Sequence, residues 1–131
     1  HKQAGIVHCD LKPGNVIWDK PNNIVKLIDF GRSQWEENAK SNRGTRGFEA
    51  PEVVDNKEAN SRQSDAYSVG KTIHWVLDKL ERSDLGDTTL LREVADGLSN
   101  VDVETRWSLD RALRVLMGEP EPKLLSPDEA A

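Results

Sequence analysis

The sequence has little that could crosslink the chain or hold it on a membrane or on nucleic acid. Its single cysteine, Cys9, excludes an internal disulfide, and such sparse cysteine use fits a reducing, intracellular compartment. It has neither an apolar run of about 18 residues nor a signal-peptide pattern. The net charge of −5 argues against general attraction to nucleic acid or acidic membranes. We therefore expect an intracellular, cytoplasmic protein that binds neither nucleic acid nor membrane.

The composition that remains is that of a globular protein. Hydrophobic residues make up 36% and charged residues 31% of the chain. A length of 131 residues predicts one domain with one modest core. Because the first residue is His1 rather than methionine, we expect the chain to be part of a longer protein.

The N-terminal third predicts loops and one hairpin. Residues 5–16 are typical of a loop that follows the end of a helix. The β-prone runs 16–18 and 24–28 flank a strong turn signal at 19–23, which predicts a β-hairpin. Residues 29–50 are polar and predict a long loop, of the kind that is usually functional or disordered.

Helices are predicted from residue 66 onward. Apolar residues from Ala66 to Leu80 keep the three-four spacing of one helical face. Tyr67 and Trp75 add apolar surface on other faces, so we expect this helix to be buried nearly all round.

Two shorter helices follow. Residues 88–98 predict one, with possible caps at 87–89, and residues 109–117 predict another. Ser108 is the candidate N-cap of the last helix, and Gly118 can end it. The proline-containing, charged tail 118–131 is predicted to be mobile.

The chain also carries five motifs in a fixed order. They are His8-Cys9-Asp10-Leu11-Lys12-Pro13-Gly14-Asn15, Asp29-Phe30-Gly31, Gly44-Thr45-Arg46-Gly47-Phe48-Glu49-Ala50-Pro51-Glu52, Asp65-Ala66-Tyr67-Ser68-Val69-Gly70, and Arg106 before the last helix. Together they resemble the C-terminal lobe of eukaryotic-type protein kinases. The resemblance implies a mainly α fold with a small β-hairpin, in which residues 1–117 form the lobe: the catalytic loop, the activation segment and a helical base.

The resemblance implies phosphoryl transfer from ATP with Mg²⁺, which depends on positioning and charge stabilisation. Asp10 would accept the proton of the substrate hydroxyl, and Lys12 would reach the transferring phosphate. Asn15 and Asp29 would bind the metal and its nucleotide through oxygen atoms. Gly31 would let the backbone turn sharply after Asp29.

Other matched residues would have structural roles. His8 and Phe30 would stack in an apolar column that ties the site to the helix at Asp65, whose carboxylate would hold the backbone near His8. Glu52 would pair with Arg106 and so close the activation segment onto the helical base. Of the site residues, Asp10 and Asp29, taken alone, could be turn residues, Lys12 a surface charge and Asn15 a loop cap.

Two details refine the class. Lys12 and Thr45 resemble the serine/threonine pattern rather than the tyrosine one. The residue before the catalytic aspartate is usually an arginine that grips a phosphate on the activation loop, but here it is Cys9. We infer that activity does not depend on phosphorylation of Ser33 or Ser41. A redox-sensitive thiol at Cys9 is the alternative.

The half of a kinase that holds ATP cannot be found in this sequence. It lacks the glycine-rich loop, the strand lysine and the helix glutamate. We therefore expect this chain to be inactive alone, with an apolar face around Ile6, Val16, Ile17 and Leu27 that the missing N-terminal lobe or another partner covers.

Three functions stay open from the sequence. The chain is a fragment of a serine/threonine kinase that phosphorylates a protein substrate, a truncated lobe that acts as a binding or regulatory module, or a relative of small-molecule kinases. Lys12, Phe30 and the Ala50-Pro51-Glu52 closure argue against the last.

Overall fold

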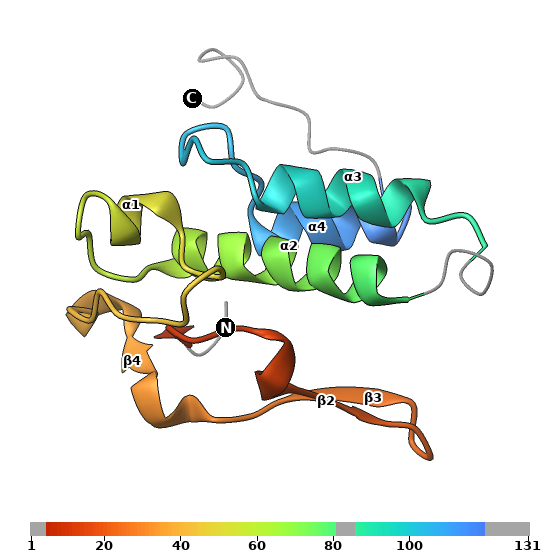
Figure 1. Cartoon of the computed structure of the whole chain (residues 1–131), viewed down its shortest axis with the longest axis horizontal. Coiled ribbons are helices and arrows are strands. Elements are labelled where there is room, and N and C mark those ends of the chain that lie inside the picture. The colour runs from red at the N-terminus through yellow and green to blue at the C-terminus, as the bar shows by residue number, and fades with distance from the viewer. Residues whose placement is uncertain (1–4, 81–85, 120–131) are drawn as a thin grey trace, which may run out of the picture.

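A computed structural model describes residues 5–80 and 86–119, with a layer of helices over two small antiparallel sheets (Figure 1). The fold is therefore mainly helical with a small hairpin, as the sequence predicts. Along the chain, the strands and α-helices are β1 (Ile6–Val7), β2 (Val16–Asp19), β3 (Ile24–Leu27), β4 (Gln34–Trp35), α1 (Pro51–Val54), α2 (Arg62–Lys79), α3 (Thr89–Leu98) and α4 (Leu109–Leu116).

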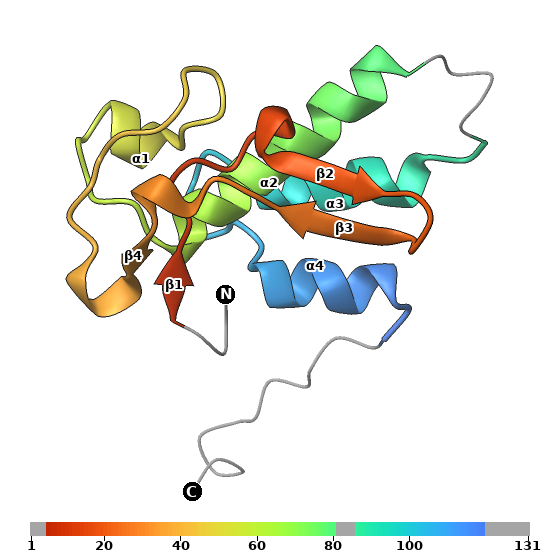
Figure 2. The same cartoon turned by 90° about the horizontal axis from the view of Figure 1, so that it is seen from below.

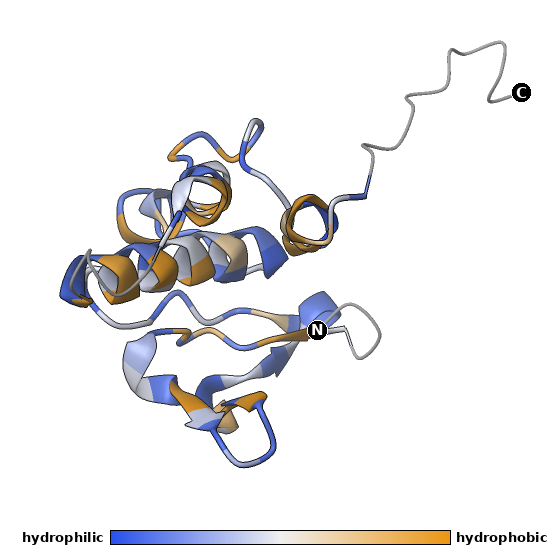
Figure 3. Ribbon diagram, turned by 90° about the vertical axis from the view of Figure 1, so that its right-hand side faces the viewer, coloured by the Kyte–Doolittle hydropathy of each residue, from blue (hydrophilic) through white to orange (hydrophobic). Residues whose placement is uncertain are grey.

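The core lies between α2, α3 and α4, and its most buried members are Ala66, Val94, Leu98 and Ala112. The backbones of α2 and α3 approach closely at Gly70, where an added Cβ would lie 2.8 Å from a main-chain oxygen of α3. Figure 3 shows this helical layer from the side, above the layer that contains the strands.

The predicted helix ends are confirmed for the last two helices. Just before α3, the Asp87 carboxylate accepts a hydrogen bond of 2.9 Å from the main-chain amide of Thr89, the first residue of the helix. The Ser108 hydroxyl caps α4, and Gly118 ends it with a φ of 72°. The remainder of the predicted mobile tail, residues 120–131, lies outside the described residues.

The prediction that the first long helix is buried nearly all round is wrong. The C-terminal half of α2 leaves Trp75 44% exposed, Val76 39% and Leu80 46%. Figure 2 shows that this end of α2 runs away from β2, α3 and α4, so its neighbours leave some of its apolar residues uncovered. In the described part of the chain, no helix has both the length and the apolar character needed to cross a membrane.

The predicted hairpin is confirmed as β2 and β3, which pair with Val16 opposite Leu27 and lie beneath α2 (Figure 2). The long loop predicted at 29–50 is more ordered than expected. Its strand β4 pairs with β1, with Ile6 opposite Trp35. This pairing joins the start of the described chain to the segment after Asp29.

Candidate functional site

The first turn of α2 holds the loop that contains His8, Cys9 and Asp10. The buried Asp65 carboxylate accepts a hydrogen bond of 2.8 Å from the His8 amide and one of 3.1 Å from the Cys9 amide. Burial raises the pKa of Asp65, although these two bonds act in the opposite direction. The Cys9 backbone adopts a left-handed φ of 72°, which turns the chain at this point.

The His8 ring connects this loop to the end of β3. Its Nδ1 accepts a hydrogen bond of 3.2 Å from the Asp10 amide, so Nε2 carries the proton and donates to the Ile28 carbonyl at 3.0 Å. The ring also lies 4.8 Å, between centroids, from the ring of Phe30, tilted by 60°. His8 itself is only 2% exposed.

Asp10, Thr45 and Lys12 form a closed network between the loop and the segment before α1. The Thr45 hydroxyl donates to Asp10 Oδ1 at 2.5 Å, and Lys12 Nζ donates to Thr45 Oγ1 at 3.0 Å. Lys12 Nζ also lies 3.8 Å from Asp10 Oδ2. Within residues 5–80 and 86–119, no hydrogen-bond donor reaches Oδ2, so this oxygen can accept one from outside.

Asn15 is oriented by two hydrogen bonds. Its side-chain amide donates to the Asp10 carbonyl at 2.8 Å, and its own carbonyl accepts from the Ile28 amide at 2.9 Å. Because the amide nitrogen is the donor, the side-chain oxygen is the atom left to bind a metal. The hairpin β2–β3 thus begins and ends beside Asp10.

Asp29 follows the hairpin in a left-handed conformation, with φ of 60° and ψ of 68°. Its Oδ1 accepts only a long bond of 3.4 Å from the Gly31 amide, and the side chain is exposed. A Cβ at Gly31 would lie 3.3 Å from this oxygen, so a side chain there would crowd Asp29.

The oxygen atoms of Asn15 and Asp29 fit magnesium, which usually binds one or two protein oxygens together with phosphates and water. The described residues contain no group of three or more His, Cys, Asp or Glu side chains suited to a metal ion. A metal at this site would therefore need ligands from a nucleotide.

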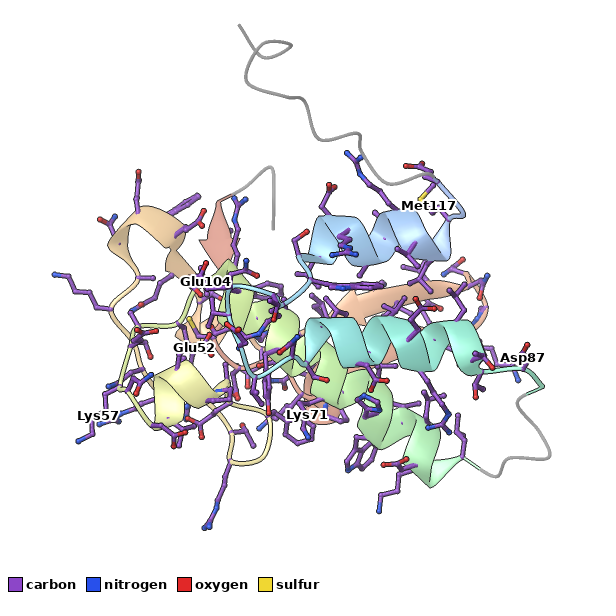
Figure 4. The ribbon with its side chains drawn as sticks, turned by 90° about the horizontal axis from the view of Figure 1, so that it is seen from above. Glu52, Lys57, Lys71, Asp87, Glu104 and Met117 are labelled. Atoms are coloured by element: carbon purple, nitrogen blue, oxygen red, sulfur yellow. The ribbon has the colours of Figure 1, made fainter. Side chains whose placement is uncertain are left out.

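Glu52 and Arg106 form a buried ion pair where α1 meets the α3–α4 loop (Figure 4). Two guanidinium nitrogens donate to the carboxylate at 2.7 and 2.8 Å, and the Arg106 side chain is 0% exposed. Arg106 also donates to the carbonyls of Gln63 and Asn100, each at 2.8 Å, and lies over the ring of Tyr67. Burial alone would raise the pKa of Glu52, but the hydrogen bonds and charge of Arg106, together with a main-chain hydrogen bond, lower it.

The Cys9 thiol is buried and is almost inaccessible to solvent. It is 4% exposed, and its Sγ donates to the Val7 carbonyl at 3.5 Å. Burial, followed by the charge of Asp65, raises its pKa to about 11. The thiol is therefore protonated near neutral pH, which favours the structural interpretation over a redox-sensitive one.

Two residues that sequence reasoning missed hold the segment between Ser41 and Phe48. The buried Asn60 amide donates to the carbonyls of Ser41 and Arg43 at 3.1 and 2.8 Å. The Ser68 hydroxyl donates to the Phe48 carbonyl at 2.6 Å. The only sequence signal near Asn60 is the capping pattern that opens α2, and Ser68 lies within the motif 65–70 but was given no role of its own.

The family model described as the protein kinase domain matches residues 1–94. Receptor-interacting serine/threonine-protein kinase 3 of Rattus norvegicus is 37% identical over 95 residues, covering 66% of this chain and 20% of that protein. Smooth muscle myosin light chain kinase of Gallus gallus is 46% identical over 114 residues, covering 84% of this chain and 6% of that protein.

A plant protein gives a similar result. G-type lectin S-receptor-like serine/threonine-protein kinase SD2-5 of Arabidopsis thaliana is 32% identical over 136 residues, covering 87% of this chain and 16% of that protein. The chain thus spans a fifth or less of the length of each of these three relatives.

Proposed function

The chain belongs to the eukaryotic-type protein kinase family, and we propose that the protein containing it transfers the γ-phosphoryl group of ATP to a serine or threonine hydroxyl of a protein substrate. The observation that carries this proposal is the closed network of Asp10, Thr45 and Lys12, which leaves one Asp10 oxygen open. The names of two of the relatives include serine/threonine-protein kinase, and the third is named as a kinase.

Each residue of the network has a distinct role in the proposed reaction. Asp10 Oδ2 accepts the proton of the substrate hydroxyl and orients that hydroxyl for attack. Lys12 places its charge beside the transferring phosphate. Thr45 keeps the two side chains at a fixed separation, because its hydroxyl donates to one and accepts from the other.

Asn15 and Asp29 are the proposed metal ligands. Mg²⁺ bound there with ATP would neutralise charge on the phosphates. The chain contributes the orientation of the two oxygens: Asn15 is fixed by its bond to the Asp10 carbonyl, and Asp29 by the turn at Gly31. His8 and Phe30 support this turn through their ring contact.

The part of the site that would bind ATP, around Asp29 and Phe30, is exposed to solvent. We assign the surface that would enclose it to an N-terminal lobe or to a partner protein. Beside this part of the site, a mainly apolar cavity of about 310 Å³ lies between the strands and the helical layer, where Leu27, Phe30, Val69 and Leu109 are among its lining residues. Leu27 is 46% and Phe30 52% exposed at its edge. Of the other residues expected on this face, Ile17 is 48% exposed, whereas Ile6 and Val16 are half-buried.

The exposed apolar cavity also favours a second candidate, a kinase-like lobe that acts as a non-catalytic binding module. Such a module would use the cavity for a partner and would not need Asp10 or Asp29. The third alternative, a small-molecule kinase, receives no support from the relatives, which are named as protein kinases.

Peptide phosphorylation by the full-length protein separates the first two candidates. Transfer from ATP that requires magnesium and is lost in Asp10→Asn supports the kinase. Calorimetry of this chain with ATP supplies the second measurement: magnesium-dependent binding that is lost in Asp29→Ala supports the proposed ligands. Absence of transfer by the full-length protein would favour the binding module.

A further inference from the structure

Two arginines that flank Thr45, Arg43 and Arg46, are exposed to solvent and lack an ion-pair partner among the described residues. Arg43 and Arg46 are both exposed, and no carboxylate in residues 5–80 and 86–119 forms an ion pair with either. They stand out because the whole chain carries a net charge of −5. Exposed cations without partners beside a catalytic group are suited to bind an anion.

The local backbone places Arg46 at the corner of a tight turn. The Phe48 amide donates to the Thr45 carbonyl at 3.0 Å, which closes a turn over residues 45–48. Gly47 has a φ of 96°, a conformation that glycine adopts readily at the third position of such a turn. Arg46 therefore occupies the second position, with its side chain exposed to solvent.

This turn is anchored at both ends. At one end the Thr45 hydroxyl bonds to Asp10, and at the other the Phe48 carbonyl accepts from Ser68 of α2. The main chain of Arg43 is held by the buried Asn60. A charge on such a fixed backbone costs less entropy to engage than a charge on a free loop.

The positions of these arginines relative to Asp10 limit what they can bind. Thr45 Oγ1 lies 2.5 Å from Asp10, and consecutive Cα atoms are about 3.8 Å apart. An extended peptide advances about 3.3–3.6 Å per residue. A peptide whose hydroxyl reaches Asp10 and whose chain runs along this segment would therefore place a side chain one to three residues away within reach of Arg46 or Arg43.

Charged residues near Arg43 and Arg46 do not cancel the positive charge of these two side chains. Arg32 donates to the Gly44 carbonyl at 3.4 Å and so adds a third cation to the same loop. Glu49 is the acidic residue nearest in sequence, and its half-buried side chain lies against Gly44. Arg43 and Arg46 thus lie in a segment to which Arg32 adds positive charge, and the nearest carboxylate in sequence, that of Glu49, lies against Gly44.

Resting on the kinase function proposed above, we propose that Arg43 and Arg46 select protein substrates with an acidic side chain one to three residues from the phosphoacceptor hydroxyl. A carboxylate and a phosphorylated side chain share the chemistry that two guanidinium groups recognise. The neighbouring Thr45 positions the catalytic pair, whereas the two arginines determine specificity.

The test uses the full-length protein and peptides that differ only at positions one to three residues from the serine, where Glu, Gln, Lys or phosphoserine is placed. We expect kcat/KM to favour Glu over Gln by about fivefold, which corresponds to about 1 kcal/mol, chiefly through KM. Arg43→Ala and Arg46→Ala should each reduce that preference, and Arg46→Glu should favour Lys instead. The phosphoserine peptides decide between a carboxylate and a phosphate as the preferred anion.

Lys20→Ala is the matched control, because it removes one exposed positive charge in the turn between β2 and β3. Figure 1 shows this turn at the opposite side of the molecule from α1. Its peptide preference should equal that of the wild type. Phosphorylation with no acidic preference, or with a preference that both arginine variants retain, would overturn the inference and leave the kinase function standing.

A binding measurement covers the case in which no peptide is phosphorylated. Fluorescence anisotropy of labelled Glu and Gln peptides on the full-length protein then tests the arginines without catalysis. Tighter binding of the Glu peptide that weakens with salt and with Arg46→Ala supports the inference even as the kinase proposal fails. Equal binding of the two peptides overturns the inference as well.

Discussion

Replacing either member of the Glu52–Arg106 pair tests whether this contact fixes the activation segment to the helical base. In Glu52→Leu, the Arg106 guanidinium keeps its bonds to the Gln63 and Asn100 carbonyls but loses both bonds to the carboxylate. The side chain is 0% exposed, so water cannot replace the lost partner. We expect a loss of about 3–5 kcal/mol in the free energy of unfolding.

The destabilisation caused by Arg106→Met should depend on pH, because the Glu52 carboxylate that is left without its partner can take up a proton. In the wild type the pKa of Glu52 is lowered below 4.5, so the pair stabilises fully above pH 4.5 and loses this contribution as the pH falls through the lower folded pKa. Without Arg106, burial raises the pKa of Glu52. Between pH 7 and pH 5 the cost of Arg106→Met should therefore shrink, whereas that of Glu52→Leu should stay constant, because the wild-type pair loses its contribution only below pH 4.5.

The double variant Glu52→Leu/Arg106→Met separates the free energy of the ion pair itself from the cost of leaving one charge buried without a partner. Apolar side chains of similar size leave no uncompensated charge, so the double variant should be more stable than Glu52→Leu alone. Urea unfolding at pH 7 and pH 5, followed by tryptophan fluorescence, measures all four proteins. A single variant that loses less than about 1 kcal/mol would refute the reasoning, because that is the value of an exposed pair.

Further predictions concern residues outside this ion pair. Gly97→Ala drives a Cβ into the tryptophan ring that covers this glycine, so thermal unfolding should show a loss of about 1–3 kcal/mol. Cys9, with a pKa raised to about 11, should react slowly with a thiol reagent at pH 8 until urea unfolds the chain, and rapid reaction of the folded chain would contradict its burial. In the full-length protein, Thr45→Ala should lower kcat about a hundredfold, whereas Ser33→Ala/Ser41→Ala should retain most activity; a large loss in the latter would show dependence on loop phosphorylation.

The sequence predicts the elements whose signal is local. The β2–β3 hairpin follows from two β-prone runs around a turn, and the three longer helices follow from their apolar spacing. The pairing of β1 with β4 could not be predicted, because two residues per strand carry no periodic signal. The exposure of Trp75 could not be predicted either, because it depends on where neighbouring elements end.

The same distinction holds for the site. Motif spacing places Asp10, Asn15 and Asp29 on one loop and one hairpin, although their catalytic and metal-binding roles stay predictions. The contacts of Asn60 and Ser68 are made to main-chain carbonyls far along the chain. Any residue can supply a carbonyl, so such contacts leave no pattern in the sequence.

The two halves of the proposed site differ in how firmly this chain holds them. Asp10 is 8% exposed and Asn15 5%, and the loop that contains Asp10 is tied by Asp65 to the buried side of α2. Asp29 is exposed, and Phe30 is 52% exposed beside the apolar cavity. A covering lobe would therefore change the nucleotide side far more than the substrate side. This difference in burial is why we expect peptide recognition by Arg43 and Arg46 to depend less on such a cover than ATP binding does.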